Sequence, residues 1–150
     1  MQLKKLPIGI QTFSEIIENG YIYIDKTDIA YNLIDNYKYA FLSRPRRFGK
    51  SLFLDTLKNI FEAKKEYFKG LAIEAKWNWD ISYPVIHINF ANGKIESRTE
   101  LNEAIIRTLE ENQKRLEINC KHADNVAGCF RELIIKAYEK YNQKVVILVD

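Results

Sequence analysis

The sequence predicts an α/β fold, in which a parallel sheet lies between helices in three layers. Short apolar runs near residues 39 to 43, 84 to 90 and 145 to 150 are typical of strands buried on both faces. Stretches with helical periodicity separate these runs, and this alternation is typical of a parallel sheet. The chain has 150 residues, of which 47% are hydrophobic and 29% are charged. We therefore expect one globular domain.

The first third of the chain predicts a helical segment, over about residues 1 to 36, that packs on the sheet. Apolar residues recur at helical spacing after Phe13, so a helix is expected near residues 11 to 19. Residues 21 to 24 are aromatic and β-branched and resemble a strand. Asp25 or Thr27 can then cap a second helix. For Thr27 we favour this capping role over a role of the Asp25-Lys26-Thr27 segment beside a binding site, because capping is the commoner use of such a residue before an apolar helix.

Three further helices are expected. Apolar residues at helical spacing follow Gly49, and Ser97 and Glu100 form a capping box before a long amphipathic stretch. Another amphipathic pattern runs from residue 130 to residue 141. Trp77 and Trp79 lie in a connection, where we favour ordinary packing under a loop over a binding platform.

A candidate phosphate-binding loop lies between the run at 39 to 43 and the helix that follows Gly49. Gly49, Lys50 and Ser51 match the last three positions of a P-loop, also called Walker A. Such a loop offers backbone N–H groups to phosphate, a Lys to the outer phosphates and a hydroxyl to Mg²⁺. The match is partial, because Arg44 stands where the first glycine is expected and Pro45 follows it.

Asp150 provides a second signal, since it closes the apolar run that begins at Val145. Phosphoryl-transfer proteins hold Mg²⁺ with an acid at the end of a buried strand, the Walker B position, and open α/β sheets bind ligands at that edge. We therefore expect ATP and Mg²⁺ as cofactors. Lys50 would reach the phosphates, and Ser51 and Asp150 would hold the metal. The predicted cradle for phosphate consists of Arg46, Arg47, Phe48, Gly49, Lys50 and Ser51.

The same residues resemble a family, the AAA-ATPase-like proteins of bacteria and archaea, which often carry a PD-(D/E)XK nuclease-like region farther along. The resemblance spans essentially the whole chain. It rests on the strings at 6 to 9, 23 to 27, 44 to 52 and 145 to 150, of which Arg-Pro-Arg-Arg-Phe-Gly-Lys-Ser is the most specific. It implies an ATP-binding P-loop NTPase-like domain over residues 1 to 150, in which the missing first glycine is a family trait.

The resemblance also implies that the chain is an N-terminal fragment, incomplete at its C-terminus. In the family a further acidic residue generally follows the run that matches Val145 to Asp150, and it would position or activate the attacking water. We therefore expect the fragment to bind ATP without efficient turnover. ATP hydrolysis would belong to the complete parent protein, with a nuclease-like domain as a candidate partner.

Two other functions remain open: a non-hydrolysing nucleotide sensor or scaffold, and a nucleic-acid-binding module that uses the arginine-rich loop. The net charge of +3 gives the second alternative little support. Arg46 and Arg47 serve equally well as phosphate ligands or as a solvated basic loop, whereas Arg44 is expected to be structural.

Cysteine content and the absence of a leader indicate a cytoplasmic protein. Two cysteines, Cys120 and Cys129, do not make a disulfide framework, so we expect both to be reduced. Together with His122 they lack a fourth ligand for zinc, and we do not expect a zinc site. No secretory signal is recognisable, and the longest apolar run is far too short to span a membrane.

Overall fold

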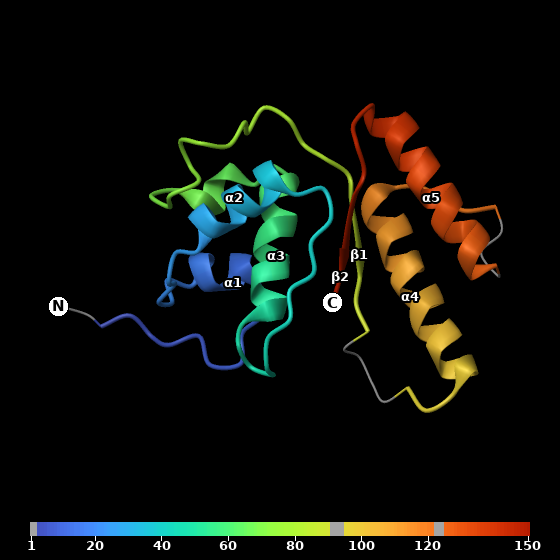
Figure 1. Cartoon of the computed structure of the whole chain (residues 1–150), viewed down its shortest axis with the longest axis horizontal. Coiled ribbons are helices and arrows are strands. Elements are labelled where there is room, and N and C mark those ends of the chain that lie inside the picture. The colour runs from blue at the N-terminus through green and yellow to red at the C-terminus, as the bar shows by residue number, and fades with distance from the viewer. Residues whose placement is uncertain (1–2, 91–94, 122–124) are drawn as a thin grey trace. The chain divides into compact units, whose positions relative to one another are not determined.

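The computed structural model describes residues 3–90, 95–121 and 125–150, and it is a mixed α/β structure. The chain divides into two compact units, Met1–Ile81 and Ser82–Asp150. The first unit contains helices, and the second combines a small parallel sheet with two long helices (Figure 1).

The first unit is built from three α-helices and one short 3-10 helix. They are α1 Phe13–Glu18, α2 Thr27–Asn36, α3 Lys50–Phe61 and η1 Lys65–Phe68. Their apolar faces meet in a common core, which confirms the helical periodicity predicted for this part of the sequence. The buried apolar side chains of the unit are Phe13, Ile16, Ala30, Leu57, Ile60, Phe68 and Ile73.

The aromatic residues of the 64–81 connection complete this core. The rings of Phe61 and Trp77 meet edge to face with centroids 5.8 Å apart, and Phe68 and Trp79 lie 5.1 Å apart. The indole N–H of Trp79 donates to the Glu74 carbonyl oxygen at 2.8 Å. The two tryptophans therefore pack under the connection as predicted, and neither forms an exposed platform.

The second unit contains β1 Val85–Ile88, α4 Arg98–Leu116, α5 Val126–Tyr141 and β2 Val146–Val149. The two strands pair in parallel, with Val85 opposite Val146 and Ile88 opposite Val149. Both helices lie on one side of the strands (Figure 1), and α4 packs directly on β1. The core between the helices and the sheet is formed by Ile86, Ile88, Leu109, Leu116, Ile118, Cys129, Leu133 and Ala137.

Polar side chains fix α4 to the sheet. The Asn112 side chain, which is buried, accepts a hydrogen bond from the His87 N–H at 2.9 Å and donates to the His87 carbonyl at 2.7 Å. At the start of α4, Ser97 and Glu100 form the predicted capping box. The amide of Asn112 thus substitutes for a neighbouring strand at this point of β1.

The strand predicted near residues 39 to 43 is not formed. Among the described residues the sheet has two strands, and neither pairs with this segment. The side chains of Tyr39 and Phe41 are 83% and 93% exposed. An apolar run becomes a strand only when a neighbour satisfies its N–H and C=O groups, and the first unit offers none. The strand-like run at 21 to 24 is also irregular. The three-layer sheet therefore stays a prediction, and the structure supports a mixed α/β fold.

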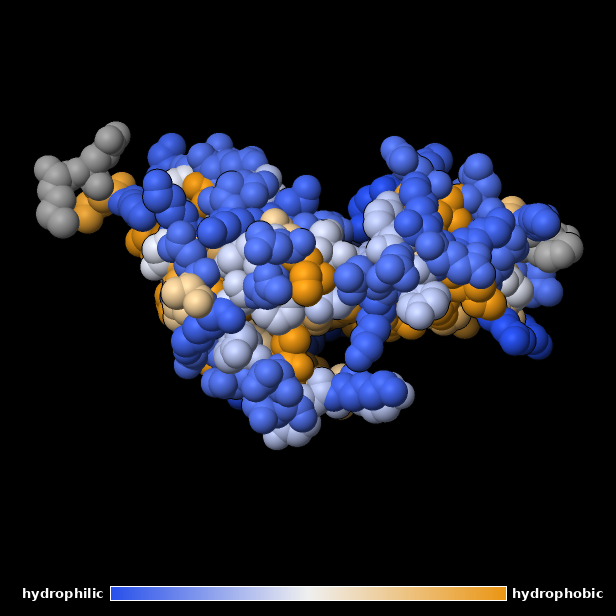
Figure 2. Space-filling model, turned by 90° about the horizontal axis from the view of Figure 1, so that it is seen from above, coloured by the Kyte–Doolittle hydropathy of each residue, from blue (hydrophilic) through white to orange (hydrophobic). Residues whose placement is uncertain are grey.

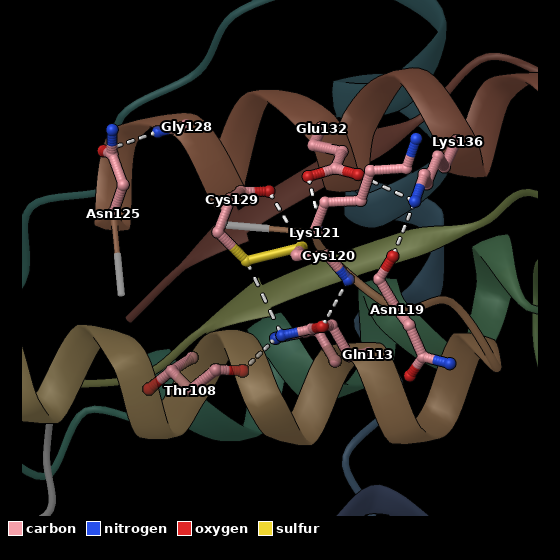
Figure 3. The surroundings of a disulfide bond; sticks show 11 residues. Thr108, Gln113, Asn119, Cys120, Lys121, Asn125, Gly128, Cys129, Glu132 and Lys136 are labelled. Atoms are coloured by element: carbon pink, nitrogen blue, oxygen red, sulfur yellow. Dashed lines mark hydrogen bonds and ion pairs between the residues drawn. A yellow bond between two sulfur atoms is a disulfide. The ribbon is translucent and has the colours of Figure 1, made fainter. Parts of the chain in front are cut away.

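The prediction of two reduced cysteines is wrong, because Cys120 and Cys129 form a disulfide (Figure 3). The chain leaves α4 and turns back along α5, which brings the two Cα atoms within 5.4 Å although nine positions separate them. Composition alone gave no information about this proximity. The third residue considered for a zinc site, His122, lies outside the described residues.

The surface is mostly polar, with apolar side chains gathered in places (Figure 2). Exposed apolar residues of the first unit include Leu6, Ile8, Ile24 and Phe48. None of the described helices has both the length and the apolar character needed to cross a membrane.

Candidate functional site

The predicted phosphate-binding loop leads into α3 with a left-handed backbone at two positions. Arg47 has φ 66° and Gly49 has φ 75°, and Gly49 is the N-cap of α3. A glycine adopts this conformation without steric cost, which explains its place immediately before the helix. Alternation of right- and left-handed residues turns successive N–H groups toward one side, as in anion-binding backbone nests.

The N–H groups of residues 48 to 52 have no hydrogen-bond acceptor in the described part of the chain. The next donor along, the N–H of Phe53, bonds to the Gly49 carbonyl at 2.9 Å and begins the helical ladder. These open donors lie at the positive end of the α3 dipole, which favours an anion. The loop therefore fits a phosphate group by both its shape and its partial charge.

Lys50 folds back onto the loop that precedes it. Its Nζ donates to the carbonyl oxygens of Arg44 at 2.8 Å and Pro45 at 3.0 Å. Two neutral carbonyl oxygens are weaker partners for an ammonium group than phosphate oxygens, so a bound phosphate can compete for it. Lys50 thus holds the loop together and is placed to respond to an anion.

The remaining predicted cradle residues differ in their exposure to solvent. Arg46, Arg47 and Phe48 are exposed, whereas Ser51 is half-buried in the first turn of α3. Neither Arg46 nor Arg47 makes an ion pair within the described ranges. Together with Arg44 and Lys50 they place four cationic side chains within seven positions, a strongly positive surface for so short a segment.

An apolar cavity of about 240 Å³ lies beside Gly49 in the first unit. Its polar groups come from Lys26, Tyr23 and Thr56, and burial raises the pKa of the Tyr23 phenol although a hydrogen bond with Thr56 opposes this shift. The sequence analysis did not identify this cavity. A usable signal was the apolar character of residues 6 to 8 and 22 to 24, which belong to no helix. The cavity is lined by Leu6, Pro7, Ile16, Ile22, Tyr23, Ile24, Lys26, Gly49, Leu52, Phe53 and Thr56.

A clasp of hydrogen bonds holds the Asp25-Lys26-Thr27 segment that borders this cavity. Asp25 Oδ1 accepts from the Thr27 N–H at 2.8 Å and from the Thr27 hydroxyl at 2.7 Å. Asp25 Oδ2 accepts from the Ala72 N–H at 2.7 Å, and the Thr27 hydroxyl oxygen accepts from the Ile73 N–H at 3.2 Å. The clasp therefore ties the start of α2 to residues 72 and 73.

These contacts correct the predicted role of Thr27. Thr27 is the first residue of α2 and is fully buried, and its own N–H is bound by Asp25. The Asp25 carboxylate, one residue before the N-cap Lys26, therefore accepts the first N–H of α2, a capping role that the sequence predicted for Thr27. Desolvation raises the pKa of Asp25, but the hydrogen bonds from the Thr27 hydroxyl and from the Ala72 and Thr27 N–H groups outweigh it and lower the pKa.

Asp150 lies directly after β2 in the second unit. Its N–H donates to the Ile88 carbonyl at 2.9 Å, and its carbonyl accepts from the Phe90 N–H at 3.2 Å, so its backbone continues the parallel ladder. The structure places Arg46 to Gly49 in the loop and Lys50 and Ser51 in the first turn of α3, and Asp150 follows the end of a strand as predicted. In the described ranges no three His, Cys, Asp or Glu side chains cluster as a metal site. The role of Asp150 at Mg²⁺ stays a prediction.

Comparison with known proteins supports the resemblance noted in the sequence. No solved structure matches the chain significantly. A protein of Azotobacter chroococcum mcd 1, described as "Uncharacterized protein in vnfD 5'region", is 46% identical over 151 residues. That alignment covers 100% of this chain and 29% of the relative, so the chain spans less than a third of that protein. The family model described as "Predicted AAA-ATPase" matches residues 7–150. The chain therefore belongs to the predicted AAA-ATPase family.

Proposed function

We propose that this chain is an Mg²⁺-dependent ATP-binding module, and that hydrolysis belongs to a longer parent protein. The observation that carries the proposal is the row of open N–H donors at residues 48 to 52. The row follows the left-handed residue Arg47, contains the left-handed residue Gly49 and leads into α3. Family membership supports nucleotide binding independently of this geometry.

The chain's own residues take distinct roles in this proposal. The N–H groups of the loop bind phosphate oxygens, and Lys50 leaves the Arg44 and Pro45 carbonyls to bind the outer phosphates. The Ser51 hydroxyl would hold Mg²⁺, and a role of Asp150 at the metal stays a prediction from the sequence. Mg²⁺, when bound, neutralises charge on the phosphates. Arg46 and Arg47 add charge-assisted contacts to phosphate.

A fluorescent ATP analogue tests the phosphate site, titrated with and without Mg²⁺. We expect Lys50→Ala to weaken binding at least tenfold, since a charge-assisted contact contributes about 1.5 to 3 kcal/mol. Lys69→Ala is the matched control, because Lys69 is exposed and lies outside the loop. Equal affinity of the wild type and Lys50→Ala would remove the basis of the proposal.

We further assign the cavity beside Gly49 to the purine base of the nucleotide. Gly49 belongs both to the phosphate loop and to the cavity lining, so the two ends of one ligand meet there. A volume of about 240 Å³ lies below the range for drug-sized ligands, which suits one ring system.

Replacing an isoleucine of the lining tests this assignment. Ile24→Ala should weaken ATP binding severalfold and leave the affinity for inorganic tripolyphosphate unchanged, because only ATP carries a base. Ile29→Ala is the control, since Ile29 is a similarly exposed isoleucine that is absent from the lining. Parallel losses for ATP and tripolyphosphate in Ile24→Ala would contradict the assignment.

The exposed arginines favour nucleic acid as a second candidate ligand. Nucleic-acid binding would show an affinity that falls steeply as the salt concentration rises, because lysines and arginines that neutralise phosphates release counterions from the nucleic acid. Tight, salt-sensitive DNA binding that ATP does not displace would favour this candidate over nucleotide binding. The other alternative is a non-hydrolysing nucleotide sensor or scaffold. ATP binding without hydrolysis by the longer parent protein would favour it.

A further inference from the structure

The two cysteines belong to the second unit and the phosphate-binding loop to the first, so the cysteines suggest a separate chemistry. Cys120 belongs to the segment after α4, and Cys129 lies in the N-terminal part of α5 (Figure 3). We propose that Cys120 and Cys129 form a thiol–disulfide exchange site, which a dithiol opens and a low-molecular-weight disulfide closes again. This proposal does not depend on ATP binding.

The two sulfur-bearing residues differ in accessibility. Cys129 is 1% exposed and belongs to the core between the helices and the sheet, whereas Cys120 is half-buried. An external thiolate therefore reaches the Cys120 sulfur first. Cys129 is then the leaving group, and this direction of attack is fixed by the fold.

Gln113 on α4 contacts both cysteines with one amide group. Its Nε2 donates to Cys129 Sγ at 3.6 Å, and its Oε1 accepts from the Cys120 N–H at 2.7 Å. A donor that faces the sulfur stabilises a thiolate at Cys129. The position of Cys129 four residues into α5 adds the positive end of the helix dipole. A better-stabilised thiolate leaves faster in exchange.

The surrounding contacts provide for the reduced state as well. Cys120 Sγ lies 3.2 Å from the Cys129 carbonyl oxygen, an acceptor for the thiol that reduction creates. The segment stays tied to α5 without the disulfide, because the Lys121 N–H donates to Glu132 at 2.9 Å and Lys136 donates to the Asn119 carbonyl at 2.6 Å (Figure 3). The thiols therefore stay within reach of each other and can be reoxidised.

The exchange balances in two steps. One thiolate of the dithiol attacks Cys120 Sγ, a mixed disulfide forms at Cys120, and Cys129 departs as a thiolate that takes up a proton. The second thiol of the dithiol then attacks the reductant's other sulfur, which is bonded to Cys120 Sγ in the mixed disulfide. Cys120 leaves as a thiolate and takes up the proton that the attacking thiol releases. The protein disulfide gains two electrons, and the dithiol is oxidised to a cyclic disulfide. Glutathione disulfide reverses the change and yields two glutathione thiols.

Native-state reduction of the intact chain tests the proposal. Dithiothreitol is added without denaturant, and the free thiols are alkylated at timed intervals and counted by mass spectrometry. We expect reduction faster than global unfolding, measured by hydrogen exchange on the same sample. Reduction that proceeds only as fast as unfolding, or thiols that stay free in glutathione disulfide, would overturn the proposal.

Three variants test the direction of attack. With glutathione disulfide, Cys129→Ser should form a mixed disulfide at Cys120, whereas Cys120→Ser should react at least tenfold more slowly at Cys129. Gln113→Glu keeps an acceptor for the Cys120 N–H but removes the donor to Cys129 Sγ, so reduction of the disulfide should slow by about tenfold. Gln11→Glu is the control for added charge. Equal reactivity of the two single-cysteine variants, or an unchanged rate in Gln113→Glu, would contradict the assignment of Cys129 as leaving group.

Discussion

Single residues determine the local structure of the first unit, and the clasp around Thr27 is the clearest case. The Thr27 hydroxyl donates to Asp25 and accepts from the N–H of Ile73, 46 positions away. Thr27 itself is fully buried, so its hydroxyl depends on protein partners for its hydrogen bonds.

Thr27→Val keeps the shape of the side chain and removes its hydroxyl. We expect a loss of about 1 to 3 kcal/mol in the free energy of unfolding, because the Ile73 N–H then has no acceptor. Urea unfolding followed by tryptophan fluorescence measures it. Thr27→Ser is the matched control, since it keeps the hydroxyl, and a Val variant as stable as the Ser variant would contradict the role of the clasp.

The lowered pKa of Asp25 predicts how stability changes with pH. The folded pKa lies below the unfolded value of 3.8, so the unfolded state binds the proton more readily. The stabilisation by Asp25 is therefore complete well above pH 3.8 and is lost as the pH falls through the folded pKa. Asp25→Asn should flatten the fall of stability below pH 4, measured by urea unfolding at a series of pH values; an equally steep fall in the variant would contradict this.

Helices and strands show which signals the sequence carries. The capping box at Ser97 and the amphipathic helices were predicted because local residues determine them. Asn112 was missed, since a polar residue in an amphipathic helix usually faces water, whereas here it is buried against β1. The prediction of a strand at 39 to 43 was wrong for a related reason, because a strand forms only by pairing with a neighbouring strand, which no local pattern specifies.

Asn112→Ala tests how α4 holds β1. The variant leaves the N–H and the carbonyl of His87 without these partners, and we expect the second unit to lose about 2 to 4 kcal/mol. Hydrogen exchange of β1 should report this loss directly. Glu111→Ala changes an exposed neighbour on the same helix and should alter little; a similar effect of both substitutions would argue against the clamp.

At the scale of the whole molecule, the sequence predicted the family better than the sheet. Gly49, Lys50 and Ser51 could be recognised because their chemistry depends on contiguous residues. The cavity beside Gly49 and the Cys120–Cys129 disulfide were not predicted, because each depends on how separate segments of the chain fold together.

Nucleotide binding also predicts a change in the stability of the whole chain. ATP with Mg²⁺ at about 100 times its Kd should raise the free energy of unfolding by about 2.7 kcal/mol, because the ligand binds only the folded state. Urea unfolding with and without ATP measures the shift. Lys50→Ala should show a shift of only about 1.4 kcal/mol or less at the same ATP concentration, because a site at least tenfold weaker is then at most at about 10 times its Kd. A shift of equal size in that variant would place ATP elsewhere.

The clasp at Thr27 has a consequence for biosynthesis. α1 has six residues, too few for an isolated helix to persist in water. The N–H of Phe13, its first residue, donates to Asp55, 42 positions away. Asp25 and Thr27 accept hydrogen bonds from the N–H groups of Ala72 and Ile73. Residues 13 to 27 therefore leave the ribosome before their partners and reach their final arrangement only after residue 73 has emerged. Until then their apolar residues stay available to chaperones.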